Sequence, residues 1–290
     1  MSSLATTPVE SLPAPTLTTS LRRVIRRPLM ASCAAVILIV SAASLLAPWI
    51  APYAYDAIDL KLAATAPSAA HWFGTDVLGR DLFSRTLHGG QISLAVGIVG
   101  TLVSLIVGVL YGAIAGYKGG RVDELMMRVV DLLYSLPYLF LVIILLVFFS
   151  SSILMLFVAL GLVQWLTMAR IVRGQVLSLR NAEFVQAARL FGTRTPGIIF
   201  RHLLPNMAGP IVVYGTLTVP TVILQEAFLS FLGLGVQPPR ASWGTLISDG
   251  AGVMSLFPWL AFFPAAILAA VLFSLNFLGD GLREALDPRS

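Results

Sequence analysis

Six long apolar runs dominate the sequence and leave the chain few ways to fold. They cover about 29–51, 92–117, 129–149, 152–169, 208–234 and 257–279. A helix needs roughly 20 mostly apolar residues to cross the hydrocarbon core of a bilayer, and each run is close to this length or above it. Only 11% of the residues are charged and 57% are hydrophobic, which excludes an ordinary soluble domain. The sequence therefore predicts an all-α polytopic membrane protein with six transmembrane helices.

Positive charge is unevenly divided between the two sides that six spans define. Of the 19 Lys and Arg residues, 15 fall on the side that holds both termini: four in 1–28, three in 118–128, six in 170–201 and two in 283–289. An excess of Lys and Arg in short loops marks the cytoplasmic side of a membrane protein. We therefore expect a multi-pass protein of the cell membrane whose N- and C-termini are cytoplasmic.

This arrangement also predicts the division of the chain. Residues 1–27 are rich in Ser, Thr and Pro, so we expect a disordered cytoplasmic tail. Residues 28–290 form the transmembrane domain, with an outer segment at 52–90 and a cytoplasmic loop at 170–207. Within the second run, Gly108, Gly112 and Gly116 make a groove that admits another helix backbone. Packing within the chain is the favoured interpretation, and a homodimer face is the alternative.

The cytoplasmic segment 183–206 is polar enough to lie in water. Phe184, Ala187, Ala188 and Phe191 follow the spacing of one apolar helix face. Gly192 then predicts the end of this helix. Thr195 and Pro196 are typical of the N-cap and first residue of a second short helix, which Pro205 would break. The apolar face can lie on anionic lipid or enter a groove on a cytoplasmic protein, and its two alanines favour the groove.

Four stretches of the sequence resemble a known family. Ala187-Ala188-x-x-x-Gly192, followed by HLLPN at 202–206, resembles the "EAA" loop of ABC importer permeases, although Gln186 departs from its acidic position. HWFGTDVLGRDLFSRTLHGGQISL at 71–94 resembles the signature of dipeptide, oligopeptide and nickel permeases of the second-permease ("C") type. LSFLGLGVQPPRASWGTLISD at 229–249 and GDGLREALDP at 279–288 are similar to the same branch.

The resemblance implies a function and a set of partners. It implies the type I ABC importer permease arrangement, with the segment 183–206 as a coupling helix pair that docks on an ATP-hydrolysing subunit. The expected function is the permease subunit of an ATP-driven, binding-protein-dependent importer of short peptides. The expected partners are a second, related permease subunit, two ATP-binding subunits, an extracytoplasmic substrate-binding protein and membrane lipid, with no nucleic acid. The expected coupling residues are Phe184, Ala187, Ala188, Phe191, Gly192, Thr195 and Pro196.

Neither lysine of the chain suits ATP binding. A P-loop requires G-x-x-x-x-G-K-[ST], but Lys61 is followed by Leu and Lys118 by Gly. We therefore expect no cofactor in this chain and no enzymatic activity of its own, with ATP and Mg²⁺ bound by the partner ATPase subunits. We also expect no metal site, because the three histidines fall in loops on opposite sides of the membrane.

Glu226 lies well inside the fifth apolar run, and a charge at that depth is costly enough to be a functional candidate. Two interpretations stay open. Glu226 can line a water-filled path and meet the amino terminus of a peptide, or it can be protonated or paired and serve only helix packing. A proton-coupled secondary transporter that uses Glu226 is the alternative to the ATP-driven importer.

The outer segment offers candidates for contact with a binding protein. Asp76, Arg80, Asp81 and Arg85 recur at intervals of four or five, which a helix would bring together. The resemblance favours a docking role for them, and a small structured cap over the outer mouth is the alternative. Arg240, beside two prolines in the second outer loop, is a further docking candidate.

Overall fold

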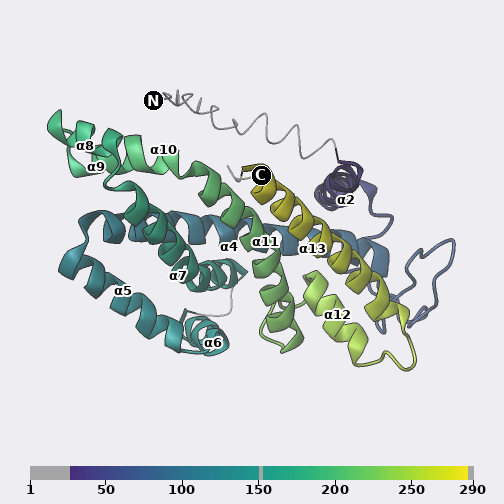
Figure 1. The fold of residues 1–290 in the computed structure, drawn as a ribbon. Coiled ribbons are helices and arrows are strands. Elements are labelled where there is room, and N and C mark those ends of the chain that lie inside the picture. The colour runs from purple at the N-terminus through teal and green to yellow at the C-terminus, as the bar shows by residue number, and fades with distance from the viewer. Residues whose placement is uncertain (1–26, 150–152, 287–290) are drawn as a thin grey trace, which may run out of the picture.

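The computed structural model describes residues 27–149 and 153–286 (Figure 1). Within these two ranges the regular structure is helical, and the only β-type pairing is an isolated bridge between Thr75 and Asp81. The predicted tail, apart from Arg27, and the serines between the third and fourth runs lie outside the described residues.

Within residues 27–149 and 153–286, five helices are long and apolar enough to cross a membrane. They are α2 (Pro28–Leu45), α4 (Leu82–Lys118), α7 (Ile153–Leu179), α11 (Ala208–Phe231) and α13 (Trp259–Leu286). A candidate for the sixth span is the bent pair of α5 (Gly120–Ser135) and α6 (Tyr138–Phe149), which meet at an angle of 92° and reach the required length and hydropathy only when counted together. The six predicted spans therefore correspond to five continuous helices and one bent pair.

The third apolar run is not the continuous helix that its composition predicts. It breaks at Leu136 and Pro137, where Leu136 adopts an extended backbone with φ −80° and ψ 137°. Proline has no amide proton to donate, and it disfavours the helical conformation of the residue before it. The break therefore follows directly from Pro137.

The second span begins ten residues before the predicted start at 92, so the outer segment 52–90 is shorter than expected. Asp81 caps α4, because its Oδ2 accepts a hydrogen bond from the backbone N–H of Ser84 at 2.8 Å. Ser84, Arg85 and Thr86 in the first turn of α4 are buried. Hydropathy does not reveal this start, because these residues are polar. They are nevertheless buried within the structure.

The glycines of α4 pack against α7, which confirms the packing interpretation. A Cβ atom on Gly108 would lie 2.6 Å from Met168 Cβ, and one on Gly112 would lie 2.3 Å from the carbonyl oxygen of Ala169. A Cβ on Gly116 would lie 3.0 Å from the carbonyl oxygen of Arg173. Helices α4 and α7 therefore meet backbone to backbone along three turns, and they form the centre of the bundle.

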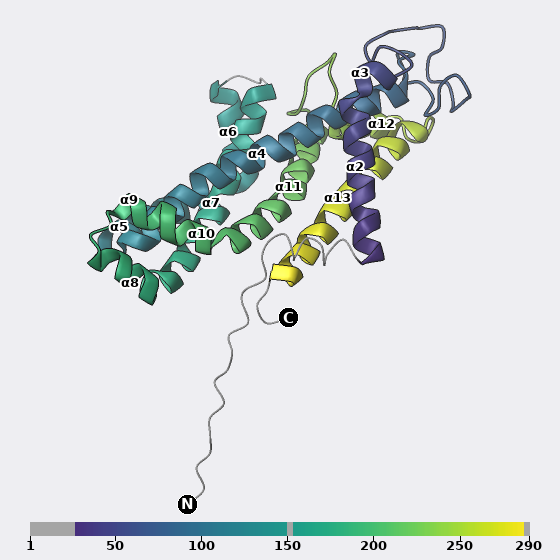
Figure 2. The ribbon, with the colours of Figure 1, turned by 90° about the horizontal axis from the view of Figure 1, so that it is seen from above.

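The contacts of α2, α11 and α13 show which parts of the chain lie at each end of the bundle. Helix α13 packs on α11 and on α2, as Figure 2 shows. Arg27, at the start of α2, donates two hydrogen bonds of 2.7 and 2.8 Å to the carboxylate of Glu284 near the end of α13. The opposite end of these helices carries α3 (Ala47–Ile50), the outer segment and α12 (Trp243–Ala251), which Ser242 caps.

Candidate functional site

A helix pair protrudes from the bundle at the end away from α3 and α12 (Figure 2). Its first member is α8 (Glu183–Leu190). Gly192 follows in the left-handed conformation with φ +75°, and the N–H of Thr193 donates to the carbonyl of Ala188 at 3.0 Å. The N–H of Gly192 donates to the carbonyl of Arg189 at 2.9 Å. These two bonds form a Schellman motif, which confirms the predicted glycine stop.

The second member of the pair differs from the prediction. Arg194, rather than Thr195, is the N-cap residue, and Thr195 is the first helical residue of α9 (Thr195–Gly197). The helical path continues through a π-helical stretch, η1 (Ile198–Leu203), and α10 (Leu204–Asn206). Pro205 does not break the path, because it occupies the first turn of α10, where an amide proton is not needed. The break comes at Met207.

The apolar residues of α8 divide between two faces instead of sharing one. Val185 and Ala188 point inward and are buried among residues of α7 and η1 such as Val172 and Ile198. Leu190 and Phe191 are 89% and 88% exposed. Phe184 and Ala187 are exposed as well. The prediction that Ala188 shares the exposed face is therefore wrong, and Leu190 was missed because apolar residues line both sides of this short helix.

Phe184, Ala187, Leu190 and Phe191 form what we call the apolar tip. The tip is held rigidly, since Val185 and Ala188 are packed beneath it and Arg189 stacks over Tyr117 with 5.1 Å between guanidinium carbon and ring centroid. Arg189 Nη2 also donates to the carbonyl of Arg180 at 3.2 Å. A rigid helix that presents apolar side chains within a basic surround is suited to a groove on another protein.

The charged residues of the outer segment form a buried network. Asp76 Oδ2 accepts hydrogen bonds from Arg80 Nε at 2.7 Å and from Arg85 Nη1 at 2.5 Å. Asp76 and Arg85 are only 8% and 4% exposed. The residues meet through a tight turn at Gly79, with φ +73°, and not along a helix as the spacing suggested.

Asp81 has a structural role at the start of α4. Besides capping the helix, its Oδ1 lies 2.9 Å from Nδ1 of His71. Together with the Asp76 network, these contacts fold residues 71–85 onto the end of the bundle. Their burial supports the structured cap, and it leaves Asp76, Asp81 and Arg85 little surface with which to bind another protein.

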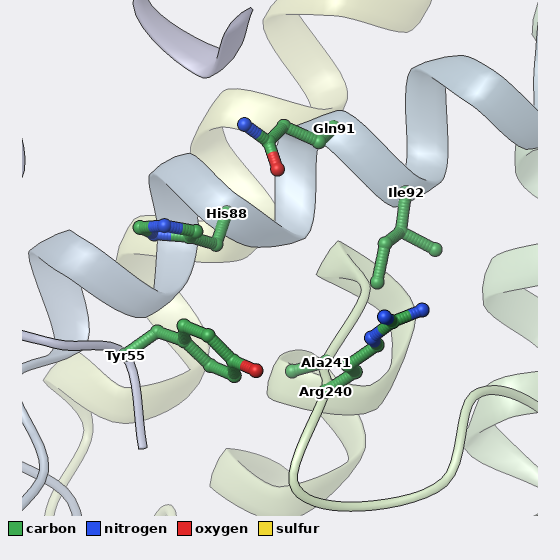
Figure 3. Close-up of a pocket in the computed structure, with 6 residues that line it drawn as sticks. All are labelled: Tyr55, His88, Gln91, Ile92, Arg240 and Ala241. Atoms are coloured by element: carbon green, nitrogen blue, oxygen red, sulfur yellow. The ribbon is translucent and has the colours of Figure 1, made fainter. Parts of the chain in front are cut away.

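Arg240 differs from the other docking candidates because its side chain is exposed. It lines a pocket of about 330 Å³ between the outer segment, α4 and the loop before α12, together with Tyr55, His88, Gln91, Ile92 and Ala241 (Figure 3). Arg240 makes no hydrogen bond or ion pair with another described residue. Of the five docking candidates, it is therefore the one with an exposed charge that has no partner among the described residues.

Glu226 is fully buried between α11, α12 and α4. Its Oε1 accepts a hydrogen bond from Ser230 Oγ at 2.6 Å, and Ser230 Oγ lies 3.3 Å from Ser242 Oγ at the cap of α12. Its Oε2 has no hydrogen-bond partner among the described residues. With no exposed surface, Glu226 has the position expected from the packing interpretation and not that of a residue lining a path.

Comparison with known proteins agrees with this architecture. The sequence model of the family described as "binding-protein-dependent transport system inner membrane component" matches residues 108–290. The model of the "N-terminal TM domain of oligopeptide transport permease C" matches residues 17–67.

Curated relatives match most of the chain. It is 52% identical over 245 residues to the oligopeptide transport system permease protein OppC of Haemophilus influenzae, covering 84% of this chain and 79% of that protein. It is 49% identical over 247 residues to the dipeptide transport system permease protein DppC of Bacillus subtilis, covering 85% and 77% respectively.

A solved structure shares the fold. It shows inward-facing conformations of the MetNI methionine ABC transporter, and one of its chains superposes with a TM-score of 0.57 at 17% sequence identity. The match covers 68% of this chain and 94% of that one.

The fold and the family matches define a multi-pass helical permease subunit of a binding-protein-dependent ABC importer, which is a transport subunit and not an enzyme. The chain belongs to the family of binding-protein-dependent transport system inner membrane components, in the branch of the C-type oligopeptide permeases. This family membership implies ATPase, permease and binding-protein partners.

Proposed function

We propose that the chain forms one half of the translocation path of an ATP-driven importer of short peptides. The other half is a second, related permease subunit, and two separate subunits bind ATP and Mg²⁺. The named relatives transport oligopeptides or dipeptides and are 49–52% identical over more than four fifths of the chain. The observation that carries the proposal is the apolar tip, which lies at the end of the bundle opposite the outer segment.

The apolar tip is the proposed contact with the ATPase subunits on the cytoplasmic side, where we also place both termini. Gly192 sets the angle between α8 and the chain that leads through η1 to α11, and Thr195 and Pro196 begin that path. Because Val185 and Ala188 are packed on α7 and η1, a displacement of α8 is transmitted to the spans. Closure of the ATPase pair on ATP would then favour an outward-open arrangement, provided that ATP binds the two states with different affinity.

The substrate-binding protein is proposed to dock at the opposite end of the bundle. The exposed Arg240 and its pocket offer a positive site there. Asp76, Arg80, Asp81 and Arg85 then contribute indirectly, because their network shapes the surface on which the binding protein rests.

The ATPase contact can be tested with a substitution at the most exposed aromatic side chain of the tip. We expect Phe191→Glu to lower recovery of the ATPase subunit at least about tenfold when the tagged chain is purified from its membrane in mild detergent, because a carboxylate cannot enter an apolar groove without losing its hydration. Phe191 is 88% exposed, so the fold of the chain itself should be preserved.

The matched control is Trp72→Glu, which places a carboxylate on an exposed aromatic position at the other end of the bundle. It should leave ATPase recovery at the wild-type level. Equal recovery of the ATPase with wild type and Phe191→Glu would remove the apolar tip from the interface.

Glu226 separates the ATP-driven importer from the proton-coupled alternative. We expect Glu226→Gln to change peptide uptake by less than about twofold, because the amide oxygen can still accept the hydrogen bond from Ser230. Uptake of labelled peptide by cells, corrected for the amount of the chain in the membrane, measures this. Loss of uptake in Glu226→Gln, with normal assembly, would revive a proton-carrying or substrate-contacting role for this residue.

A further inference from the structure

A second pocket, of about 360 Å³, lies where α5 and α6 meet, against α7 and α11. Figures 1 and 2 show the bend between α5 and α6 beside α7. Its polar lining residues come from four separate helices or their junctions: Tyr134, Tyr138, Gln164, Thr167 and Gln225. The other six lining residues are apolar, and none of the lining residues is charged.

The backbone between α5 and α6 is not helical, so its polar groups need hydrogen-bond partners that lipid cannot supply. Leu136 and Pro137 lie outside both helices, between the amphipathic α5 and the apolar α6. Non-helical backbone at membrane depth is tolerated only where it is buried in protein or lines a water-filled cavity, because lipid cannot satisfy its polar groups. The pocket at the bend fits a water-filled cavity of this kind.

Two glutamines on neighbouring spans meet inside the pocket. Gln164 lies near the middle of α7, and its Nε2 donates a hydrogen bond of 3.3 Å to Oε1 of Gln225 on α11. Both side chains are only half-buried. A primary amide offers two donor hydrogens and an oxygen with two lone pairs. Among the described residues, Gln164 Oε1 and Gln225 Nε2 have no hydrogen-bond partner, so the pair keeps one free acceptor and one free donor group.

An ion pair continues the polar surface along α7. Arg170 Nη2 donates to Asp131 Oδ1 on α5 at 2.7 Å, and the guanidinium carbon lies 4.1 Å from the ring centroid of Tyr134. The side chains of Arg170 and Asp131 are 40% and 64% exposed. Charged groups on a spanning helix face a bundle interior or water and not lipid, so the ion pair at the predicted cytoplasmic end of α7 marks this side of the chain as one that does not face lipid.

We propose that Gln164 and Gln225 form a subsite that hydrogen-bonds the backbone amides of a peptide crossing the membrane; this inference rests on the proposed function. A free carbonyl and a free N–H on adjacent side chains complement the N–H and C=O that every peptide bond carries. The absence of charge from the lining suits a neutral peptide bond rather than a charged terminus. Such hydrogen bonds do not depend on the peptide's side chains. They therefore suit a transporter that takes up peptides of different sequence.

The test uses the complete transporter with its binding protein in ATP-loaded vesicles. Two substrates are compared: trialanine, and trialanine N-methylated at its central amide, which lacks that donor. We expect Gln164→Met and Gln225→Met each to lower trialanine uptake roughly 2- to 10-fold, the effect of losing one net hydrogen bond. We expect the preference for trialanine over its methylated form to shrink in the Gln164→Met variant, whose lost carbonyl accepts from that amide.

The comparison between variants cancels any preference that the binding protein itself has, because that protein is the same throughout. Asn276→Leu is the matched control, since Asn276 lies on a spanning helix, donates to its own helix at Leu272 and does not line the pocket. It should leave both uptake rates unchanged. Unchanged uptake and preference in both glutamine variants would overturn the subsite. Absence of any peptide uptake by the wild-type transporter would overturn the proposed function instead.

A second measurement covers the case in which a glutamine variant fails to assemble. Cys33 is the only cysteine, so Cys33→Ala combined with Thr167→Cys gives the chain a single thiol at the pocket. A water-soluble maleimide should label this thiol in the assembled transporter, and trialanine should slow the labelling during turnover. A thiol that is never labelled in the complete assembly would place the pocket against the partner permease and overturn the proposal.

Discussion

Gly112→Leu should prevent α4 from packing on α7 and leave little folded protein. A Cβ atom at this position lies 2.3 Å from the carbonyl oxygen of Ala169 and 3.0 Å from the amide nitrogen of Arg173. Both are backbone atoms of α7, so no side-chain rotation can relieve the clash. Overpacking a core costs about 1–3 kcal/mol and occasionally more. We expect Gly112→Ala to cost this much and Gly112→Leu to exceed it, since three further carbons must be accommodated.

The measurement is the melting temperature of the tagged chain in detergent, followed by size-exclusion chromatography after heating. Gly174→Ala on α7 and Gly209→Ala on α11 are matched controls, because a Cβ at either position meets nothing within 4 Å. Both should leave the melting temperature unchanged or raise it, since alanine favours a helix over glycine by about 1 kcal/mol. A Gly112→Leu chain that melts like the wild type would contradict the close approach of α4 and α7.

Asp76→Ala should loosen the outer segment by leaving the buried Arg85 with only the more distant carboxylate of Asp249, at 4.0 Å. Removing one member of a buried ion pair costs about 3–5 kcal/mol, because the remaining charge is uncompensated. Arg85 is 4% exposed and donates a short hydrogen bond to the carboxylate of Asp76. The double variant Asp76→Ala/Arg85→Met should recover part of the loss, since the more deeply buried charge is then absent.

Protease sensitivity of residues 52–81 in vesicles, together with the melting temperature, measures this effect. Asp56→Ala is the control, because Asp56 is an exposed acid on the same segment and should change neither quantity. A different result would favour direct docking. If Asp76→Ala left folding intact but weakened the affinity of the binding protein, Asp76 would contact that protein, as the family resemblance favours.

The sequence alone determined the features that depend on short stretches of chain. Apolar runs of spanning length predicted the six spans, and Gly192 predicted the end of α8, because both follow from local hydropathy and backbone freedom. Pro137 could have predicted the break between α5 and α6. The apolar residues around it favoured a single continuous span instead. Motif resemblance supplied the family, which the relatives confirm.

Tertiary structure alone decided which of these residues meet. Ala188 is turned inward because α8 lies on α7 and η1, and Asp76 pairs with Arg85 because a turn at Gly79 folds the segment back. Glu226 is linked through Ser230 to the cap serine Ser242, 16 positions away, and Gln164 meets Gln225 across 61 positions. Local propensity cannot specify such pairs, because their burial depends on how whole helices pack and not on the residues beside them.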